Sequence, residues 1–197
     1  MKQRGKVLLL FSGGLDSGVL LWRLKSEGAT VSTLSLFFPG RRKMEIHSAK
    51  KLAALAGLKD NHKVFLPFVP PPKAEKGCYI PKRNLMVYGI AASLAETIGA
   101  KKIFGGHIRH DGEVFEDAKK SYLMKISALA GIPFAFPFIG LGKKDIIKIG
   151  FQIGVPFEHC WSCSRDGKKH CWDCKSCQER EMGFREAGIE DPLGRFR

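Results

Sequence analysis

The chain has 197 residues, of which 44% are hydrophobic and 26% are charged, a balance that is typical of one folded domain and excludes a disordered chain. No run approaches the roughly 20 apolar residues of a membrane-spanning helix, and the first apolar stretch is too short for a signal peptide, so we expect a cytoplasmic protein. The net charge of +14 predicts attraction to polyanions such as nucleic acids or nucleotide phosphates, although a solvated basic surface is an equally simple explanation.

Short apolar runs alternate with helical patterns along the chain. In order we expect strand 6–11, helix 15–27, strand 29–38, helix 42–58, strand 62–68, helix 83–100, strand 101–106, helix 119–131, strand 132–138 and helix 143–154. This alternation predicts an α/β fold with a mainly parallel five-stranded sheet and helices on both of its faces. Two prolines favour an edge position for the last strand, and the proline-rich segment 67–81 is expected to form a loop or flap.

The segment SGGLDS, residues 12–17, connects the first predicted strand directly to the first predicted helix. Such a turn collects unpaired backbone N–H groups where the helix dipole favours an anion, so it predicts a phosphate site. Gly13 and Gly14 permit close approach and unusual φ angles, and the hydroxyls of Ser12 and Ser17 can donate to phosphate oxygens. Asp16 beside a phosphate indicates a bridging Mg²⁺ ion. The alternative is a tight turn in which a serine caps the helix.

Five of the six cysteines fall between Cys160 and Cys177. Four thiolates can complete the tetrahedral shell of a Zn²⁺ ion, and the two-residue spacings near the end of this segment suit such a site. The fifth cysteine leaves the ligand set open at this point. An iron–sulfur cluster and free redox cysteines are the alternatives.

The turn SGGLDS resembles the PP-loop of ATP pyrophosphatases, which split ATP into AMP and pyrophosphate while they adenylate a substrate. The segment HCWSCSRDGKKHCWDCKSCQEREMGFREAGIEDP, with IPKRN at 80–84 and PFIGLGKKDIIKIG at 137–150, is similar to the 7-cyano-7-deazaguanine synthases of the QueC family. The resemblance implies a Rossmann-like (adenine nucleotide alpha hydrolase-like) domain at 1–155 and a zinc-binding subdomain at 156–197. It also implies a homodimer, and zinc ligands Cys163, Cys171, Cys174 and Cys177.

Members of this family convert 7-carboxy-7-deazaguanine to the nitrile with ammonia and ATP, through an acyl-adenylate and an amide that is activated again. The resemblance therefore implies a deazapurine carboxylate and ammonia as substrates, with ATP, Mg²⁺ and Zn²⁺ bound. Lys143 matches a family lysine, and Arg83 and Asn84 open a predicted helix where they contact phosphate or carboxylate, or else form an ordinary cap. The implied catalytic residues are Asp16, Ser17, Arg83 and Lys143, and the implied nucleotide contacts are Ser12, Gly13, Gly14, Leu15, Asp16, Ser17, Gly106 and His107.

The segment 107–122 departs from the family pattern, because His107 replaces an asparagine and Ala118-Lys119 replaces a Cys-Arg pair. A different carboxylate substrate is therefore one alternative. A second alternative is direct thiolation of tRNA, because the GGH at 105–107 resembles the Gly-His stretch of tRNA-modifying members of the wider superfamily. Thiolation needs cysteines that are free to carry sulfur, and only Cys78 and Cys160 lie outside the implied zinc site. The third is a non-catalytic zinc module that binds nucleic acid. The side chains at 107–111 serve proton transfer or nucleotide contact, or else belong to a polar surface loop.

Overall fold

A computed structural model describes residues 4–39, 41–66 and 80–194 of the chain. Its centre is a five-stranded, fully parallel sheet in the order β3-β2-β1-β4-β5. The strands are β1 (Arg4–Leu10), β2 (Ala29–Phe37), β3 (Asn61–Phe65), β4 (Ile103–Phe104) and β5 (Phe134–Ala135). The helices are α1 (Leu15–Ser26), α2 (Lys43–Leu55), α3 (Arg83–Thr97), α4 (Arg109–Val114), α5 (Lys120–Ala130), α6 (Lys143–Gln152) and α7 (Lys175–Ala187), with 3₁₀ turns η1 (Glu116–Ala118) and η2 (Phe157–His159).

The predicted fold class is confirmed, and each expected strand and helix is present. Strand β5 lies at the edge of the sheet, as its flanking prolines indicate, and it is only two residues long because Pro133 and Pro137 cannot donate to a neighbouring strand. The helices α4 and α7 have no counterpart among the predicted elements. Most of the predicted proline-rich loop, residues 67–79, lies outside the described residues.

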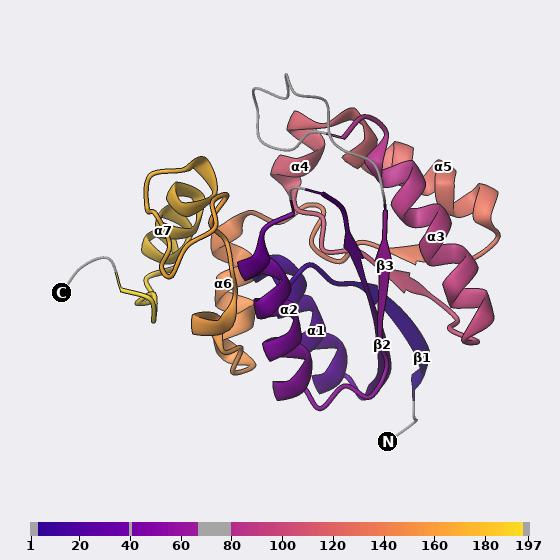
Figure 1. Ribbon diagram of the computed structural model, residues 1–197, viewed down its shortest axis with the longest axis horizontal. Coiled ribbons are helices and arrows are strands. Elements are labelled where there is room, and N and C mark those ends of the chain that lie inside the picture. Colours follow the sequence, from indigo (N-terminus) through magenta and orange to yellow (C-terminus); the bar gives the residue numbers. More distant parts are fainter. Residues whose placement is uncertain (1–3, 40, 67–79, 195–197) are drawn as a thin grey trace.

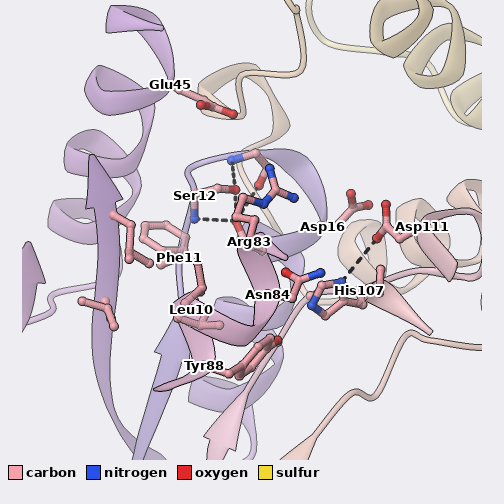
Figure 2. Close-up of a pocket in the computed structure, with 18 of the residues that line it drawn as sticks. Leu10, Phe11, Ser12, Asp16, Glu45, Arg83, Asn84, Tyr88, His107 and Asp111 are labelled. Carbon is pink, nitrogen blue, oxygen red and sulfur yellow. Dashed lines mark hydrogen bonds and ion pairs between the residues drawn. The ribbon is translucent and has the colours of Figure 1, made fainter. Parts of the chain in front are cut away.

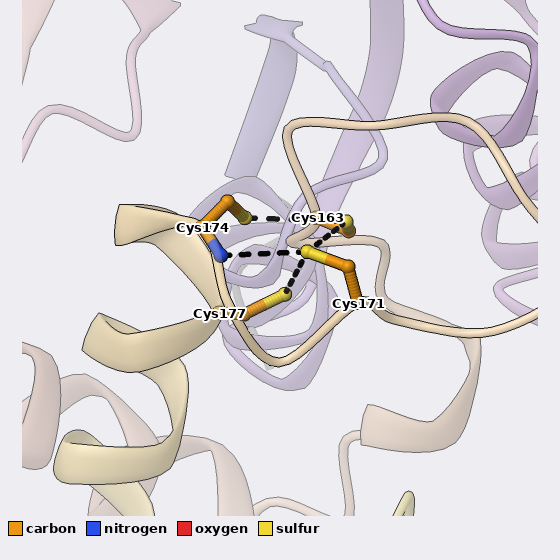
Figure 3. Close-up of side chains that lie close together, drawn as sticks. All are labelled: Cys163, Cys171, Cys174 and Cys177. Atoms are coloured by element: carbon orange, nitrogen blue, oxygen red, sulfur yellow. Dashed lines mark hydrogen bonds between the residues drawn. The ribbon is translucent and has the colours of Figure 1, made fainter.

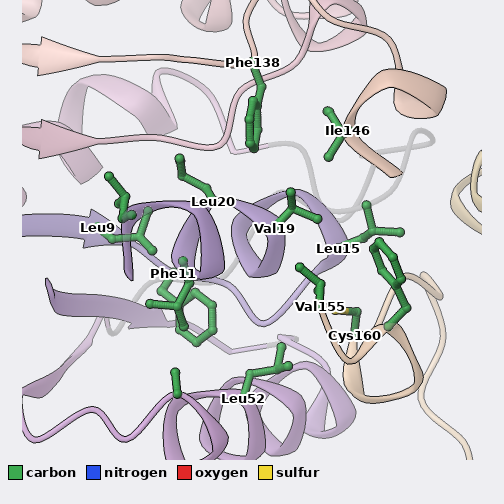
Figure 4. Packing of buried hydrophobic residues seen from close by; sticks show 14 of the residues in the cluster. Leu9, Phe11, Leu15, Val19, Leu20, Leu52, Phe138, Ile146, Val155 and Cys160 are labelled. Carbon is green, nitrogen blue, oxygen red and sulfur yellow. The ribbon is translucent and has the colours of Figure 1, made fainter. Parts of the chain in front are cut away.

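Helices cover both faces of the sheet (Figure 1). Side chains on β1 alternate between the faces, so Leu9 enters one hydrophobic cluster and Leu8 the other. The first cluster joins the sheet to α1, α2 and α6, and Figure 4 shows Leu9 and Phe11 within it. The second cluster joins the sheet to α3 and α5. The core is therefore divided by the sheet into two apolar layers, as in other doubly wound folds.

The strand order reverses at β1, which pairs with β2 on one side and β4 on the other. The chain first moves outward from β1 to β3 and then returns to the opposite side of β1 at β4. Ligands of open parallel sheets bind outside the carboxyl ends of the strands at such a reversal. The fold thus points to the residues that follow β1 and β4.

The C-terminal part packs against α6 through α7. On α7, Phe184 meets Phe157 edge-on at 5.1 Å between ring centroids and joins the same apolar cluster as α1. The fully buried Arg180 donates to both carboxylate oxygens of Asp191, at 2.6 and 2.7 Å, and to the backbone carbonyls of Phe157 and Cys160. This guanidinium therefore links Asp191 to the segment 157–160, which precedes the four clustered cysteines. The domain boundary at 155/156 stays a prediction.

None of the helices within the described ranges is long and apolar enough to cross a membrane.

Candidate active site

The glycine turn lies between β1 and α1, at the reversal of the strand order. Gly13 has φ +86°, and a Cβ atom there would lie 2.5 Å from the backbone nitrogen of Ala49 and 2.7 Å from the carbonyl oxygen of Glu45. Only glycine fits, because helix α2 passes so close to the turn. Gly14 has an extended backbone with φ −76°, so the expectation of an unusual φ is confirmed for Gly13 alone.

The two serines of the turn hold each other in place. The Ser12 and Ser17 hydroxyl oxygens lie 3.0 Å apart, Ser12 Oγ accepts the Gly14 N–H at 3.1 Å, and Ser17 Oγ donates to the Gly14 carbonyl at 3.1 Å. In the described structure, the first three amides of α1, those of Leu15, Asp16 and Ser17, have no hydrogen-bond partner. These amides and the positive end of the helix dipole form an anion site.

The carboxylate of Asp16 is paired with a lysine from far along the chain. Lys143 Nζ lies 2.7 Å from both Asp16 oxygens, and both side chains are partly buried. Lys143 is the first residue of α6, and its stem lies against Gly183 of α7, where a Cβ atom would come within 2.5 Å of Lys143 Cγ. The structure therefore places a cation and a carboxylate together at the start of α1.

A cavity of about 390 Å³ opens beside this turn (Figure 2). Of the predicted site residues, Gly13 and Leu15 lie behind its wall, and Lys143 reaches it through its contact with Asp16. The predicted residues that line the cavity are Ser12, Gly14, Asp16, Ser17, Arg83, Asn84, Gly106 and His107. The remaining walls come from the ends of β1 and β2, from Arg41, Arg42 and Glu45 at the start of α2, from α3 and from the α4 region.

The floor of the cavity carries the fully buried Tyr88 and the largely buried His107, whose Nδ1 lies 3.8 Å from Asp111 Oδ2. Burial, assisted by the charge of Arg83, lowers the pKa of His107 to about 4, so its imidazole is neutral near neutral pH. Burial also raises the pKa of Tyr88, whose hydroxyl has no partner among the described residues and faces Gly105 so closely that no side chain fits there. The floor can therefore donate and accept hydrogen bonds without adding a charge.

Asn84 serves the fold at this floor. Its backbone N–H donates to Asp117 Oδ2 and its side-chain Nδ2 donates to the Asp117 carbonyl, both at 3.0 Å. These bonds hold the start of α3 against η1, and since the N-cap of α3 is Lys82, the Asn84 side chain does not cap the helix. Asp111 and Phe115 line the same cavity, so the segment after His107 forms a helix beside the site instead of a polar surface loop.

Sequence reasoning did not identify Tyr88 and Arg41 as site residues. Arg41 Nη2 donates to the Ser12 carbonyl at 2.8 Å, Nη1 donates to the Leu36 carbonyl, and Nε lies 3.2 Å from Glu45 Oε2. Arg41 thus joins the ends of β1 and β2 beside the cavity. Only the strand order brings these ends together, so no local pattern could have identified this role.

Four cysteines converge at the start of α7 (Figure 3). The sulfurs of Cys163, Cys171, Cys174 and Cys177 all lie within 4.8 Å of one another, and three of the pairs are separated by 3.4, 4.0 and 4.0 Å. Zinc–sulfur bonds of about 2.3 Å at a tetrahedral ion place sulfurs about 3.8 Å apart. The spacing fits one tetrahedral ion, whereas an iron–sulfur cluster spreads its thiolate ligands over several irons.

The protein favours the thiolate of Cys174 at this cluster, whereas burial raises the pKa of Cys163 and of Cys177. The backbone N–H groups of Ser164 and Arg165 donate to Cys174 Sγ and Cys163 Sγ, each at 3.3 Å. Although burial opposes ionisation of Cys174, hydrogen bonds from Ser164 and Cys177 outweigh it and lower the pKa of that thiol to about 6. Ionised sulfurs are what a metal ion requires as ligands.

Cys160 lies outside the cysteine cluster. It packs in the core, where a Cβ atom on Gly18 would lie 3.1 Å from its sulfur, and burial raises the pKa of its thiol to about 12. The four-cysteine ligand set that the resemblance implies is therefore the set that the structure assembles.

The parallel sheet, its reversal at β1 and the glycine turn at the start of α1 define an adenine nucleotide alpha hydrolase-like, PP-loop fold. Two solved structures share it. NMN synthetase from Francisella tularensis has a TM-score of 0.57 at 14% identity, over 96% of this chain and 79% of that one. A 4-thiouridine synthetase in complex with RNA and bound ATP has a TM-score of 0.57 at 18% identity, over 93% of this chain and 53% of that one.

Sequence comparison assigns the chain to one family within this fold. A family model described as queuosine biosynthesis protein QueC matches residues 6–188, and the chain belongs to this family. A relative from Thermoplasma acidophilum is 34% identical over 97% of this chain and 92% of its own length, and one from Archaeoglobus fulgidus is 31% identical over 95% and 89%. Both relatives are named 7-cyano-7-deazaguanine synthase, so the chain belongs to a family of enzymes.

Proposed function

We propose that the protein is an ATP-dependent ligase that adenylates 7-carboxy-7-deazaguanine and uses ammonia to convert it to 7-cyano-7-deazaguanine, releasing AMP and pyrophosphate. The observation that carries the proposal is one cavity that joins the unpartnered amides of the glycine turn to the neutral floor at Tyr88 and His107. One end of the cavity suits phosphates and the other suits an uncharged heterocycle. The membership of the QueC family supports the choice of heterocycle.

The chemistry begins with a carboxylate, whose oxygen is a poor leaving group. Attack of that oxygen on the α-phosphate of ATP forms the acyl-adenylate and expels pyrophosphate, and ammonia then displaces AMP to give the amide. A second ATP adenylates the amide oxygen and releases pyrophosphate again. The oxygen then leaves as part of AMP, the nitrogen loses its two protons, and the nitrile remains. Each ATP loses pyrophosphate, so the site must offset the charge that grows on this leaving group.

The residues of the turn have separate roles in this scheme. The amides of Leu15, Asp16 and Ser17 donate to the departing pyrophosphate, and the Lys143 ammonium offsets its charge. A carboxylate with phosphate oxygens is the donor set that Mg²⁺ prefers, so Asp16 would hold the ion. When bound, Mg²⁺ supplies Lewis-acid polarisation of the phosphates. Cys163, Cys171, Cys174 and Cys177 would hold the zinc ion, and four thiolate ligands would leave it no catalytic part, so its role would be structural.

The floor residues position the heterocycle. A pKa of about 4 makes His107 a weak base near neutral pH, so its role is to hydrogen-bond the ring instead of removing protons. The hydroxyl of Tyr88 donates a second hydrogen bond to the same ring, which gives this buried group the partner it lacks. We further propose that the protein is a homodimer in the cytoplasm. Light scattering, which measures the mass in solution, tests the dimer.

Two observations weigh against the alternative functions. Direct thiolation needs accessible, ionisable cysteines, but Cys160 is buried and has a raised pKa. A non-catalytic zinc module has no need of the Asp16–Lys143 pair beside an anion site. A QueC-like enzyme acting on another carboxylate uses the same turn, and only the floor would differ.

The test is turnover with ATP, Mg²⁺, ammonia and 7-carboxy-7-deazaguanine, with AMP measured by chromatography and the nitrile by mass spectrometry. Lys143→Met keeps the aliphatic stem against Gly183 but removes the cation, and we expect kcat/KM to fall by about a hundredfold or more. Lys144→Met, at the exposed next position of α6, is the matched control and should stay within about twofold. AMP formation with another carboxylate but not with 7-carboxy-7-deazaguanine would show that the other carboxylate is the substrate. Equal turnover of both variants would remove Lys143 from the mechanism.

A further inference from the structure

A second cavity, of about 600 Å³, lies between helix α2 and the segment that carries the cysteines. Its walls come from α2, η2, the segments 160–161 and 168–172, and residues 192–194. It shares no lining residue with the cavity at the glycine turn, and the reaction proposed above does not use it. Its volume falls within the range of about 300–1,000 Å³ that is usual for small-molecule sites.

Aromatic rings form one side of this second cavity. The rings of Trp161 and His170 lie 4.3 Å apart between centroids, and those of His170 and Trp172 lie 5.7 Å apart. Trp172 holds its ring there from a left-handed backbone conformation with φ 58°, which is uncommon for a bulky side chain. The rings of each pair are tilted, by 47° and 36°, so they form an angled aromatic wall against which another aromatic ring can pack.

The same wall presents a buried donor that has no partner. Trp161 is only 8% exposed, and its indole Nε1–H makes no hydrogen bond within the part of the chain that the structure describes. Its backbone N–H is already used by the Gly13 carbonyl and by Ser48 Oγ, each at 3.2 Å, so the residue is fixed in position. A buried indole N–H normally finds an acceptor, and a ligand in the cavity that this residue lines can supply one.

The remaining side chains make the second cavity basic. Lys51, Lys168 and Lys169 line it, and all three are exposed. The one carboxylate among the lining residues, that of Glu158, lies 3.8 Å from His159 Nε2. A ligand with a net negative charge is therefore favoured.

We propose that this second cavity binds a nucleoside phosphate. The base stacks on the rings of Trp161, His170 and Trp172 and accepts the indole N–H, while the phosphate lies at the lysines. An acidic peptide or a lipid headgroup would satisfy the lysines but leave the aromatic wall without a matching ring. A free nucleotide and one unpaired residue of an RNA strand share this chemistry.

The test uses the fluorescence of the tryptophans that line the cavity. The chain has three tryptophans, so Trp22→Phe leaves only Trp161 and Trp172 to report. We expect adenosine monophosphate or a six-residue oligoadenylate to quench this emission saturably, and ribose 5-phosphate, which has no base, to do so much more weakly. Quenching by the mononucleotide identifies a free nucleotide as ligand, and quenching by the oligonucleotide alone identifies an RNA strand.

Charge-reversed variants show where the probe binds. In the Trp22→Phe background, Lys168→Glu with Lys169→Glu should weaken binding about tenfold or more. Lys120→Glu with Lys125→Glu, both exposed on α5, make the same change in net charge and should leave the affinity unchanged. Neither pair touches the glycine turn, so AMP formation should persist in both. Absence of quenching by both probes, equal losses in the two double variants, or equal binding of ribose 5-phosphate would overturn the proposal.

Discussion

The buried imidazole of His107 should make the stability of the fold depend on pH in a way that one substitution removes. Its pKa is about 4 in the folded chain, against an ordinary value of 6.5, because burial disfavours the charged ring and Arg83 adds to the effect. Between these two values the unfolded chain binds more protons than the folded chain. The contribution of His107 to stability is therefore present above pH 6.5 and is lost as the pH falls through 6.5 towards 4.

The size of this effect follows from the two pKa values. At about pH 5 the unfolded imidazole is almost fully protonated and the folded one is mostly neutral, so the free energy of unfolding should drop by about 2 kcal/mol relative to pH 7.5. His107→Gln keeps a polar side chain of similar size but cannot titrate. We expect the part of the pH dependence that is lost in this variant to be about 2 kcal/mol.

Urea unfolding followed by circular dichroism measures the difference between the two pH values for each chain. Subtracting the difference of the variant from that of the wild type cancels metal release and the titration of the other histidines, which affect both chains. A double difference below about 0.5 kcal/mol would refute the argument, because it would mean that His107 titrates as it does in the unfolded chain.

Two further predictions concern the C-terminal region. Cys174→Ser removes one of four sulfur ligands, so bound zinc, measured by atomic absorption, should fall well below about one ion per chain, whereas Cys160→Ala should retain it because that sulfur lies in the core. Asp191→Asn strips the fully buried Arg180 of its charge partner and should lower the free energy of unfolding by about 3 kcal/mol in urea. Asp173→Asn, at the exposed pair with Arg165, should cost less than about 1 kcal/mol, and equal losses would contradict the role of burial.

The fold was predictable because its elements carry their own signals. Strands β1 and β2 are apolar runs long enough to be recognised, and helices such as α5 end at a glycine, Gly131, with a left-handed backbone. Helix α7 was missed because KSCQEREMGFREA is largely polar and has few apolar residues. Its stability comes from the adjacent cysteines and from Arg180, whose buried bonds no periodic pattern indicates.

The candidate site likewise has features that the sequence predicts and features that only the structure shows. The anion-binding turn could be predicted because its signal is local, six residues between a strand and a helix. The contact of Asp16 with Lys143 spans 127 residues, and the burial of Tyr88 depends on β4 lying beside β1. These features arise from the strand order, so only the structure brings them into view. The cysteine spacing indicated a metal, but excluding Cys160 required its position in the core.

The contact between Gly183 and the stem of Lys143 connects the cysteine cluster to the glycine turn. Cys174 precedes the first turn of α7, the helix carries Gly183 two turns further on, and Gly183 sets how far the ammonium can reach. If a metal ion is bound at the cysteines, chelation would remove one of the anchors of α7, beside Arg180 and Phe184, and so loosen the position of the Lys143 ammonium next to Asp16. A metal ion at the four cysteines would in this way influence the geometry of the glycine turn's ion pair from outside the cavity.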